Sequence, residues 1–133
     1  MNQIRNRSRI HPMNLYLDEM TPSTVTIHDV DCIYRNHAKN FWCMFEWKNP
    51  GERLSAPKTL ASLHELNDAF ENASSSYRGV FIVRLGFSVD AFPFTDEEQL
   101  DVVWHHCGMT QERTYTSGAR SAVQYILDHG RLL

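Results

Sequence analysis

An amphipathic helix between two strand-like runs constrains this sequence more than any other feature. Apolar residues recur at helical spacing over about residues 57–72, which predicts a helix with one apolar face. The aromatic-rich run 41–47 precedes it and stops at Asn49-Pro50-Gly51, and the apolar run 78–85 follows it, as in a strand buried on both faces. A helix that crosses between two strands favours a βαβ unit with parallel strands.

The aromatic-rich run is also predicted to form a hairpin with the segment before it. Residues 24–34 are rich in β-branched side chains, as in a strand, and a short polar loop separates them from residue 41. If residues 37–40 form that loop, facing residues have numbers that sum to 77.

This register brings charged side chains together on one face of the hairpin. Asp31 faces Glu46, and Asp29 faces Lys48. The other face carries residues that suit a core: Val30, Cys32, Tyr34, Phe41, Cys43, Phe45 and Trp47. Two neighbouring carboxylates repel each other, and a hard cation such as Mg²⁺ would relieve that repulsion. A lysine beside the ion can assist an attacking water, so the group suits phosphodiester hydrolysis.

The C-terminal half is expected to add helical material. Residues 95–98 have the pattern of a capping box, and residues 100–104 suit either a short helix or a strand. Residues 117–129 predict a helix that ends at Gly130. The order of elements indicates an α/β fold with a small mixed β-sheet flanked by helices, formed by residues 1–133 as one domain.

Within residues 24–85, Asp31 and Glu46-Trp47-Lys48 resemble the motif of the PD-(D/E)XK nuclease superfamily. The segment from Asn49 to Ser55, which leads into a helix, is similar to VRR-type and phage resolvase-like members. The resemblance implies a restriction-endonuclease-like αβββαβ core, dependence on Mg²⁺ or Mn²⁺, and hydrolysis of DNA by a nuclease of phage or repair type.

By the same resemblance, Asp31, Glu46 and the backbone carbonyl of Trp47 would bind the metal, and Lys48 would position the attacking water. Lys58, on the following helix, would point into the site. The family's proline does not precede the aspartate here, which leaves Asp29 as an alternative or additional ligand.

The basic residues Arg5, Arg7 and Arg9 lie in an N-terminal arm, residues 1–12, that could hold phosphate or be a solvated, flexible terminus. The net charge of −3 argues against binding nucleic acid through charge alone. A homodimer is compatible with the resemblance, because a small domain presents little surface to a duplex.

A different class of function remains open. The charged face could be a solvated set of ion pairs on a non-enzymatic interaction protein, such as a phage or mobile-element factor that binds a host protein. A zinc module built on Cys107 and neighbouring histidines is a third hypothesis, although adjacent residues on a regular element point in different directions. His64 and His106 have no evident partner.

The sequence also predicts where the protein works. It contains no long apolar run and no apolar segment near its start, so neither a membrane span nor a secretory signal is expected. Its three cysteines form no CxxC pair, which favours reduced thiols and a cytoplasmic location.

Overall fold

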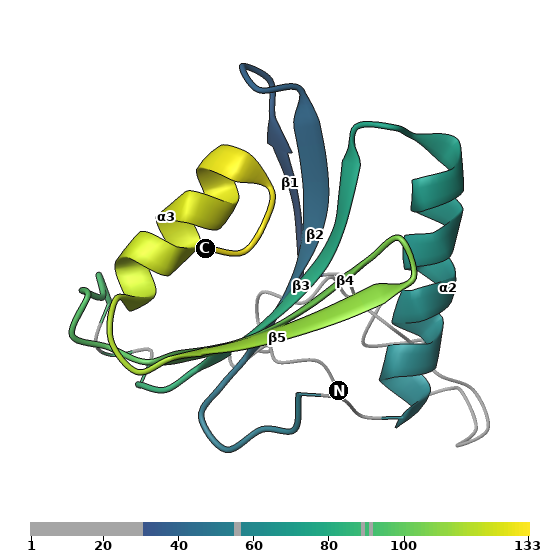
Figure 1. The fold of residues 1–133 in the computed structure, drawn as a ribbon. Coiled ribbons are helices and arrows are strands. Elements are labelled where there is room, and N and C mark those ends of the chain that lie inside the picture. The colour runs from purple at the N-terminus through teal and green to yellow at the C-terminus, as the bar shows by residue number, and fades with distance from the viewer. Residues whose placement is uncertain (1–30, 55–56, 89, 91) are drawn as a thin grey trace, which may run out of the picture.

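The computed structural model describes residues 31–54, 57–88, 90 and 92–133, and these residues form a five-stranded sheet between two helices (Figure 1). The strands are β1 (Cys32–Asn36), β2 (Phe41–Lys48), β3 (Tyr77–Leu85), β4 (Leu100–His106) and β5 (Met109–Tyr115), and the helices are α2 (Pro57–Ala73) and α3 (Ala119–His129). The predicted α/β class and the mixed sheet flanked by helices are confirmed.

The sheet order is β1-β2-β3-β4-β5, and the predicted βαβ unit lies at its centre. Strands β2 and β3 are parallel, and α2 connects them. The other neighbouring strands are antiparallel. Both strands of the parallel pair therefore lie inside the sheet, and α2 packs against β3 and β4.

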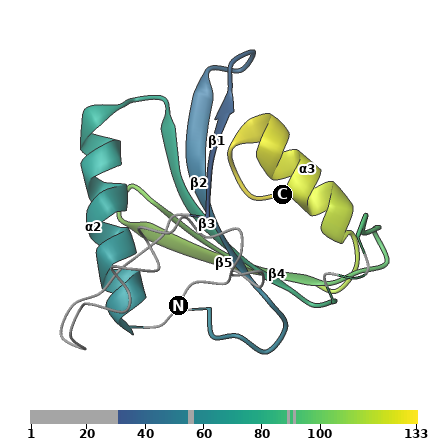
Figure 2. The same cartoon turned by 180° about the vertical axis from the view of Figure 1, so that it is seen from behind.

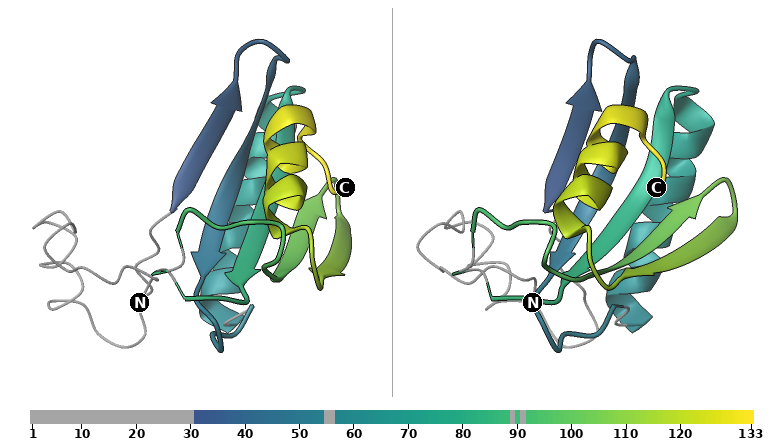
Figure 3. Two further views of the ribbon diagram at one scale, coloured as in Figure 1. Left: turned by 90° about the vertical axis from the view of Figure 1, so that its left-hand side faces the viewer. Right: turned by 60° about the vertical axis from the view of Figure 1, so that its left-hand side comes forward.

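Two helices cover the two faces of this sheet. Figure 2 and Figure 3 show α2 on one face and α3 on the other. The core on the α3 face includes Cys43, Phe45, Phe81, Val83, Val102 and Ile126. The core on the α2 face includes Met44, Leu63, Tyr77, Val80, Ile82 and Val103. Alternate residues of β2 thus enter opposite cores, as the period of two requires.

A bulge at Gly79 changes the pairing register of β3 with β2. The pairing of β2 with β3 shifts by one residue between Trp42↔Tyr77 and Met44↔Val80. Gly79 has φ +92, and a Cβ atom built there would lie 2.2 Å from the backbone oxygen of His105 on β4. Glycine is thus required both by the backbone conformation and by the close approach of the next strand.

The helical material expected directly after residue 95 is not observed, and of the two alternatives for residues 100–104 the strand is confirmed. Residues 100–106 form β4, and a two-residue turn at Cys107 and Gly108 leads into β5. Both turn residues have positive φ (52 and 73), as in a type I′ hairpin turn. Residues 100–104 suited either element locally, and pairing with β3 makes them a strand.

The expected capping box at residues 95–98 does not begin a helix there. Instead, the Asp96 carboxylate accepts hydrogen bonds from the backbone N–H and the hydroxyl of Ser121, both at 2.7 Å, in the first turn of α3. Hydrogen bonds to the side chain and backbone of Ser121 lower the pKa of Asp96. The helix predicted at 117–129 is confirmed, and Gly130 ends it in the left-handed conformation.

Candidate functional site

The β1–β2 hairpin has the predicted register. The observed pairs run from Cys32↔Phe45 to Asn36↔Phe41, and in each the residue numbers sum to 77. Asp31 lies directly before β1, so the same register continued by one residue brings it to Glu46. The strand expected over 24–34 is observed from Cys32, and residues 24–30 lie outside the described residues.

The Asp31 carboxylate is anchored to the β2 backbone. Its Oδ2 atom accepts a hydrogen bond of 2.9 Å from the N–H of Trp47, the residue between Glu46 and Lys48. An extended residue directs its N–H and its C=O to the same side of the strand. The carbonyl of Trp47 therefore lies on the same edge of β2 as the Asp31 carboxylate.

Glu46 and Lys48 are buried, with only 2% and 6% of their surfaces exposed. Both alternate with Phe45 and Trp47, which pack on the α3 face, so the two charged residues lie on the α2 face of β2. Charged groups are rarely buried so completely, because water no longer solvates them. A solvated ion-pair face, the alternative interpretation, would leave Glu46 and Lys48 more exposed than they are.

A second charged pair continues the row of Lys48 across the sheet. Lys48 faces Arg84 on β3, and Arg84 faces Asp101 on β4. The Arg84 guanidinium donates two hydrogen bonds to Asp101 Oδ2, at 2.7 and 3.0 Å, and a third, of 3.2 Å, to the Glu52 backbone oxygen. The guanidinium is therefore held in place beside the end of β2.

The surroundings of Asp101 favour the ionised form of its carboxyl group. Burial alone would raise the pKa of Asp101, but hydrogen bonds from Arg84 and Thr114 and the charge of Arg84 hold it below its ordinary value. The sequence prediction did not include Arg84 and Asp101. The available signal was a charged residue next to one end of each of two largely apolar strands.

Several predicted site residues lie outside the described part of the chain. Asp29 and the arginines of the N-terminal arm (Arg5, Arg7 and Arg9) belong to the segment before residue 31. Lys58 is in the first turn of α2, the helix that follows β2, but its side chain is not described. These assignments remain predictions.

Two histidines that had no evident partner in the sequence have partners in the structure. The His64 ring packs edge-on against His105, with 4.5 Å between the ring centres. His106 Nδ1 lies 3.2 Å from Glu71 Oε1, and its ring is stacked on Trp104.

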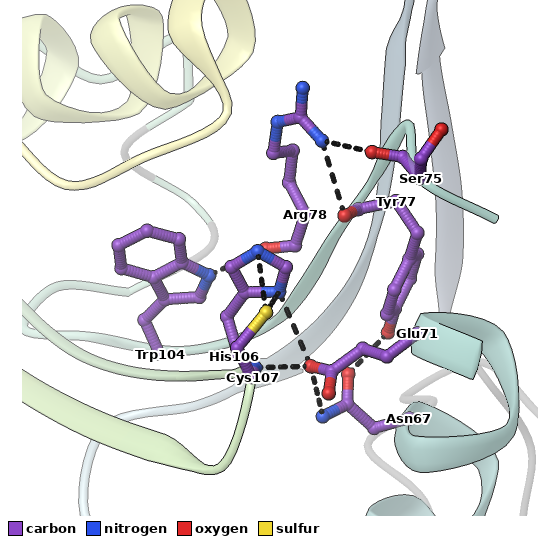
Figure 4. A network of polar contacts seen from close by, with 8 residues as sticks. All are labelled: Asn67, Glu71, Ser75, Tyr77, Arg78, Trp104, His106 and Cys107. Atoms are coloured by element: carbon purple, nitrogen blue, oxygen red, sulfur yellow. Dashed lines mark hydrogen bonds and ion pairs between the residues drawn. The ribbon is translucent and has the colours of Figure 1, made fainter.

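The cluster of Glu71, His106 and Cys107 forms a second group of potential metal ligands among the described residues (Figure 4). Its ligand atoms all lie within 4.8 Å of one another. The expectation that adjacent residues diverge fails here, because Cys107 is in the turn rather than on the strand and has φ +52.

Comparison of the chain with protein-family models, with curated proteins and with solved structures gave no match. The function is therefore inferred from the chemistry of the side chains and their positions. No helix in the described part of the chain is both long and apolar enough to cross a membrane.

Proposed function

We propose that this protein is a metal-dependent nuclease that hydrolyses phosphodiester bonds in DNA, and that its reaction centre lies at the end of β2. The proposal depends chiefly on one observation: the Asp31 carboxylate is fixed against the backbone between two buried charged residues, Glu46 and Lys48.

The donor set suits Mg²⁺ or Mn²⁺. In this proposal Asp31, Glu46 and the carbonyl of Trp47 supply three oxygen ligands, the kind that hard divalent cations prefer. The hydrogen bond from the Trp47 N–H to Asp31 supports this grouping, because in an extended strand the Trp47 carbonyl lies on the same side as that N–H. Asp29 stays an alternative ligand. The ion would polarise the phosphate and lower the pKa of a bound water.

The positively charged side chains beside the metal ligands would act on the water and the phosphate. Lys48, two residues after Glu46 on the same face of β2, would position the attacking water. Arg84, held by Asp101 in the same row, would balance charge on the phosphate. Lys58 and the arginines of the N-terminal arm would hold the nucleic-acid backbone.

The crossover from β2 through α2 to a parallel β3 is also the connection that a restriction-endonuclease-like core has after its E-x-K strand. We therefore also propose that the chain has a restriction-endonuclease-like core. We further propose that it works in the cytoplasm and binds duplex DNA as a homodimer.

The direct test is cleavage of plasmid and oligonucleotide DNA with Mg²⁺ or Mn²⁺, with a chelator as the blank. Because Glu46 and Lys48 are buried, isosteric variants avoid cavities: Glu46→Gln and Lys48→Met. Each should reduce the cleavage rate by about 10²-fold or more, since each removes a charge that acts in the transition state. Glu97→Gln and Lys39→Met, at exposed positions, are the matched controls and should cleave normally.

Folding of each variant is checked by circular dichroism. Undiminished cleavage by both folded variants would show that the reaction centre lies elsewhere. A folded, unmodified chain that cleaves no DNA with either ion would favour the interaction protein instead.

A further inference from the structure

The turn between β4 and β5 brings an exposed thiol beside a histidine and a glutamate from another element. Cys107 is in the turn, His106 ends β4, and Glu71 lies near the end of α2, 35 residues earlier in the chain than His106 (Figure 4). We propose that these three side chains bind a Zn²⁺ ion, at a site separate from the proposed reaction centre.

The distances from His106 Nδ1 to the other two ligand atoms are close to those in a tetrahedral zinc site. Zn²⁺ holds nitrogen and oxygen at about 2.0–2.2 Å and sulfur at about 2.3 Å, which separates neighbouring ligand atoms by roughly 3.3–3.7 Å. His106 Nδ1 is 3.2 Å from Glu71 Oε1 and 3.7 Å from Cys107 Sγ, and Sγ is 3.4 Å from Nε2 of the same ring. The sulfur therefore lies over the ring, and it must rotate away from the ring face to share an ion with Nδ1. The Cys107 side chain is exposed, so the sulfur can adjust by rotation to the ion.

The contact between His106 and Glu71 requires a proton or a metal ion on Nδ1, and the neutral tautomer with its proton on Nδ1 supplies one as an ordinary hydrogen bond. A carboxylate oxygen and an unprotonated ring nitrogen 3.2 Å apart would place two lone pairs against each other. Either a proton on Nδ1 or a cation between the two atoms resolves this. Zn²⁺ can replace that proton, and it would also bind the Cys107 thiolate.

Buried residues hold Glu71 in position for this role. The Asn67 amide donates to Glu71 Oε1 at 3.2 Å, and the Tyr77 hydroxyl donates to Asn67 Oδ1 at 2.5 Å. Asn67 and Tyr77 are 2% and 1% exposed. The backbone N–H of Cys107 also donates to Oε1, at 2.6 Å. Such outer contacts fix the orientation of a ligand before the metal binds.

The ligand types select the metal. A thiolate and an imidazole with one carboxylate favour zinc over Mg²⁺, which prefers oxygen ligands. Three protein ligands leave the fourth position for water, and the ion would tie α2 to the β4–β5 hairpin.

Cobalt substitution tests this site in the full-length chain. Co²⁺ occupies zinc sites, and a cobalt–thiolate bond gives a charge-transfer absorption that oxygen ligands do not produce. We expect one Co²⁺ per chain with this absorption, displaced by Zn²⁺. Cys107→Ser should abolish the absorption, and Glu71→Gln, which keeps an oxygen acceptor, should weaken Co²⁺ binding at least tenfold.

Cys32→Ser is the matched control, because it removes another cysteine that is not fully buried, and it should keep the absorption. Glu46→Gln should also keep it, which separates this site from the proposed reaction centre. The inference is overturned if the unmodified chain gives no thiolate absorption, or if the absorption persists in Cys107→Ser. Should Cys107→Ser fail to fold, unchanged Co²⁺ affinity in Glu71→Gln overturns it.

Discussion

At the scale of single residues, buried ionisable side chains distinguish this molecule. Glu46, Lys48 and His105 are all less than 9% exposed. Burying a charge costs several kcal/mol unless partners or ligands compensate for it.

His105 yields a prediction about pH. Burial, together with the nearby His64, lowers the pKa of His105, and Glu112 opposes this shift only in part. The unfolded chain, in which a histidine has a pKa of about 6.5, therefore binds this proton more readily than the folded chain does. Stability should fall as the pH drops below about 6.5.

The measurement is the urea midpoint at pH 7 and pH 5. The variant His105→Gln does not titrate at this position, so its midpoint should fall less over this interval than that of the unmodified chain. His37→Gln, in the exposed β1–β2 loop, is the control and should leave the pH dependence unchanged. An equal fall in His105→Gln would mean that other groups cause the dependence.

At the scale of elements, β3 and β4 approach each other so closely at Gly79 that no side chain fits there. The bulge at Gly79 sets the register of β3 against β2 and lets the backbone of β4 approach closely. This register also places Lys48 beside Arg84, so the geometry of the charged row depends on the bulge.

The variant Gly79→Ala should destabilise the fold by about 3 kcal/mol or more. Its methyl group would overlap the His105 backbone oxygen, and alanine is strained at φ +92. Gly118→Ala has a similar φ of +81 but open space around it, so it should cost only about 1–2 kcal/mol. Chemical denaturation of the two variants gives the comparison, and equal losses would show that the close strand contact is unimportant.

At the scale of the whole molecule, the proposed reaction centre should couple metal binding to folding. An ion that binds only the folded chain stabilises it by about 2.7 kcal/mol when its concentration is 100 times its Kd. For a chain of 133 residues this corresponds to a rise in Tm on the order of 10 °C.

Thermal unfolding with increasing Mn²⁺ measures this coupling. Tm should rise in the unmodified chain and in Cys107→Ser, but not in Glu46→Gln, because only the last variant lacks a proposed ligand for the hard ion. If millimolar Mn²⁺ leaves the Tm of the unmodified chain unchanged, the result contradicts a carboxylate metal site at the end of β2.

The sequence by itself determined the β1–β2 register, the extent of α2 and the parallel placement of β3. Each of these depends on residues close together in the chain, through strand alternation, helical spacing and turn residues. Within one hairpin, that information was enough to bring Asp31 beside the Glu46–Lys48 segment.

Only the tertiary structure decided the rest. Residues 100–104 had no decisive local pattern and became a strand by pairing with β3. The partners Arg84 and Asp101, and the cluster of Glu71, His106 and Cys107, come from separate elements. Local periodicity carries no information about which distant side chains meet, because the packing of helices and strands against one shared core sets those contacts.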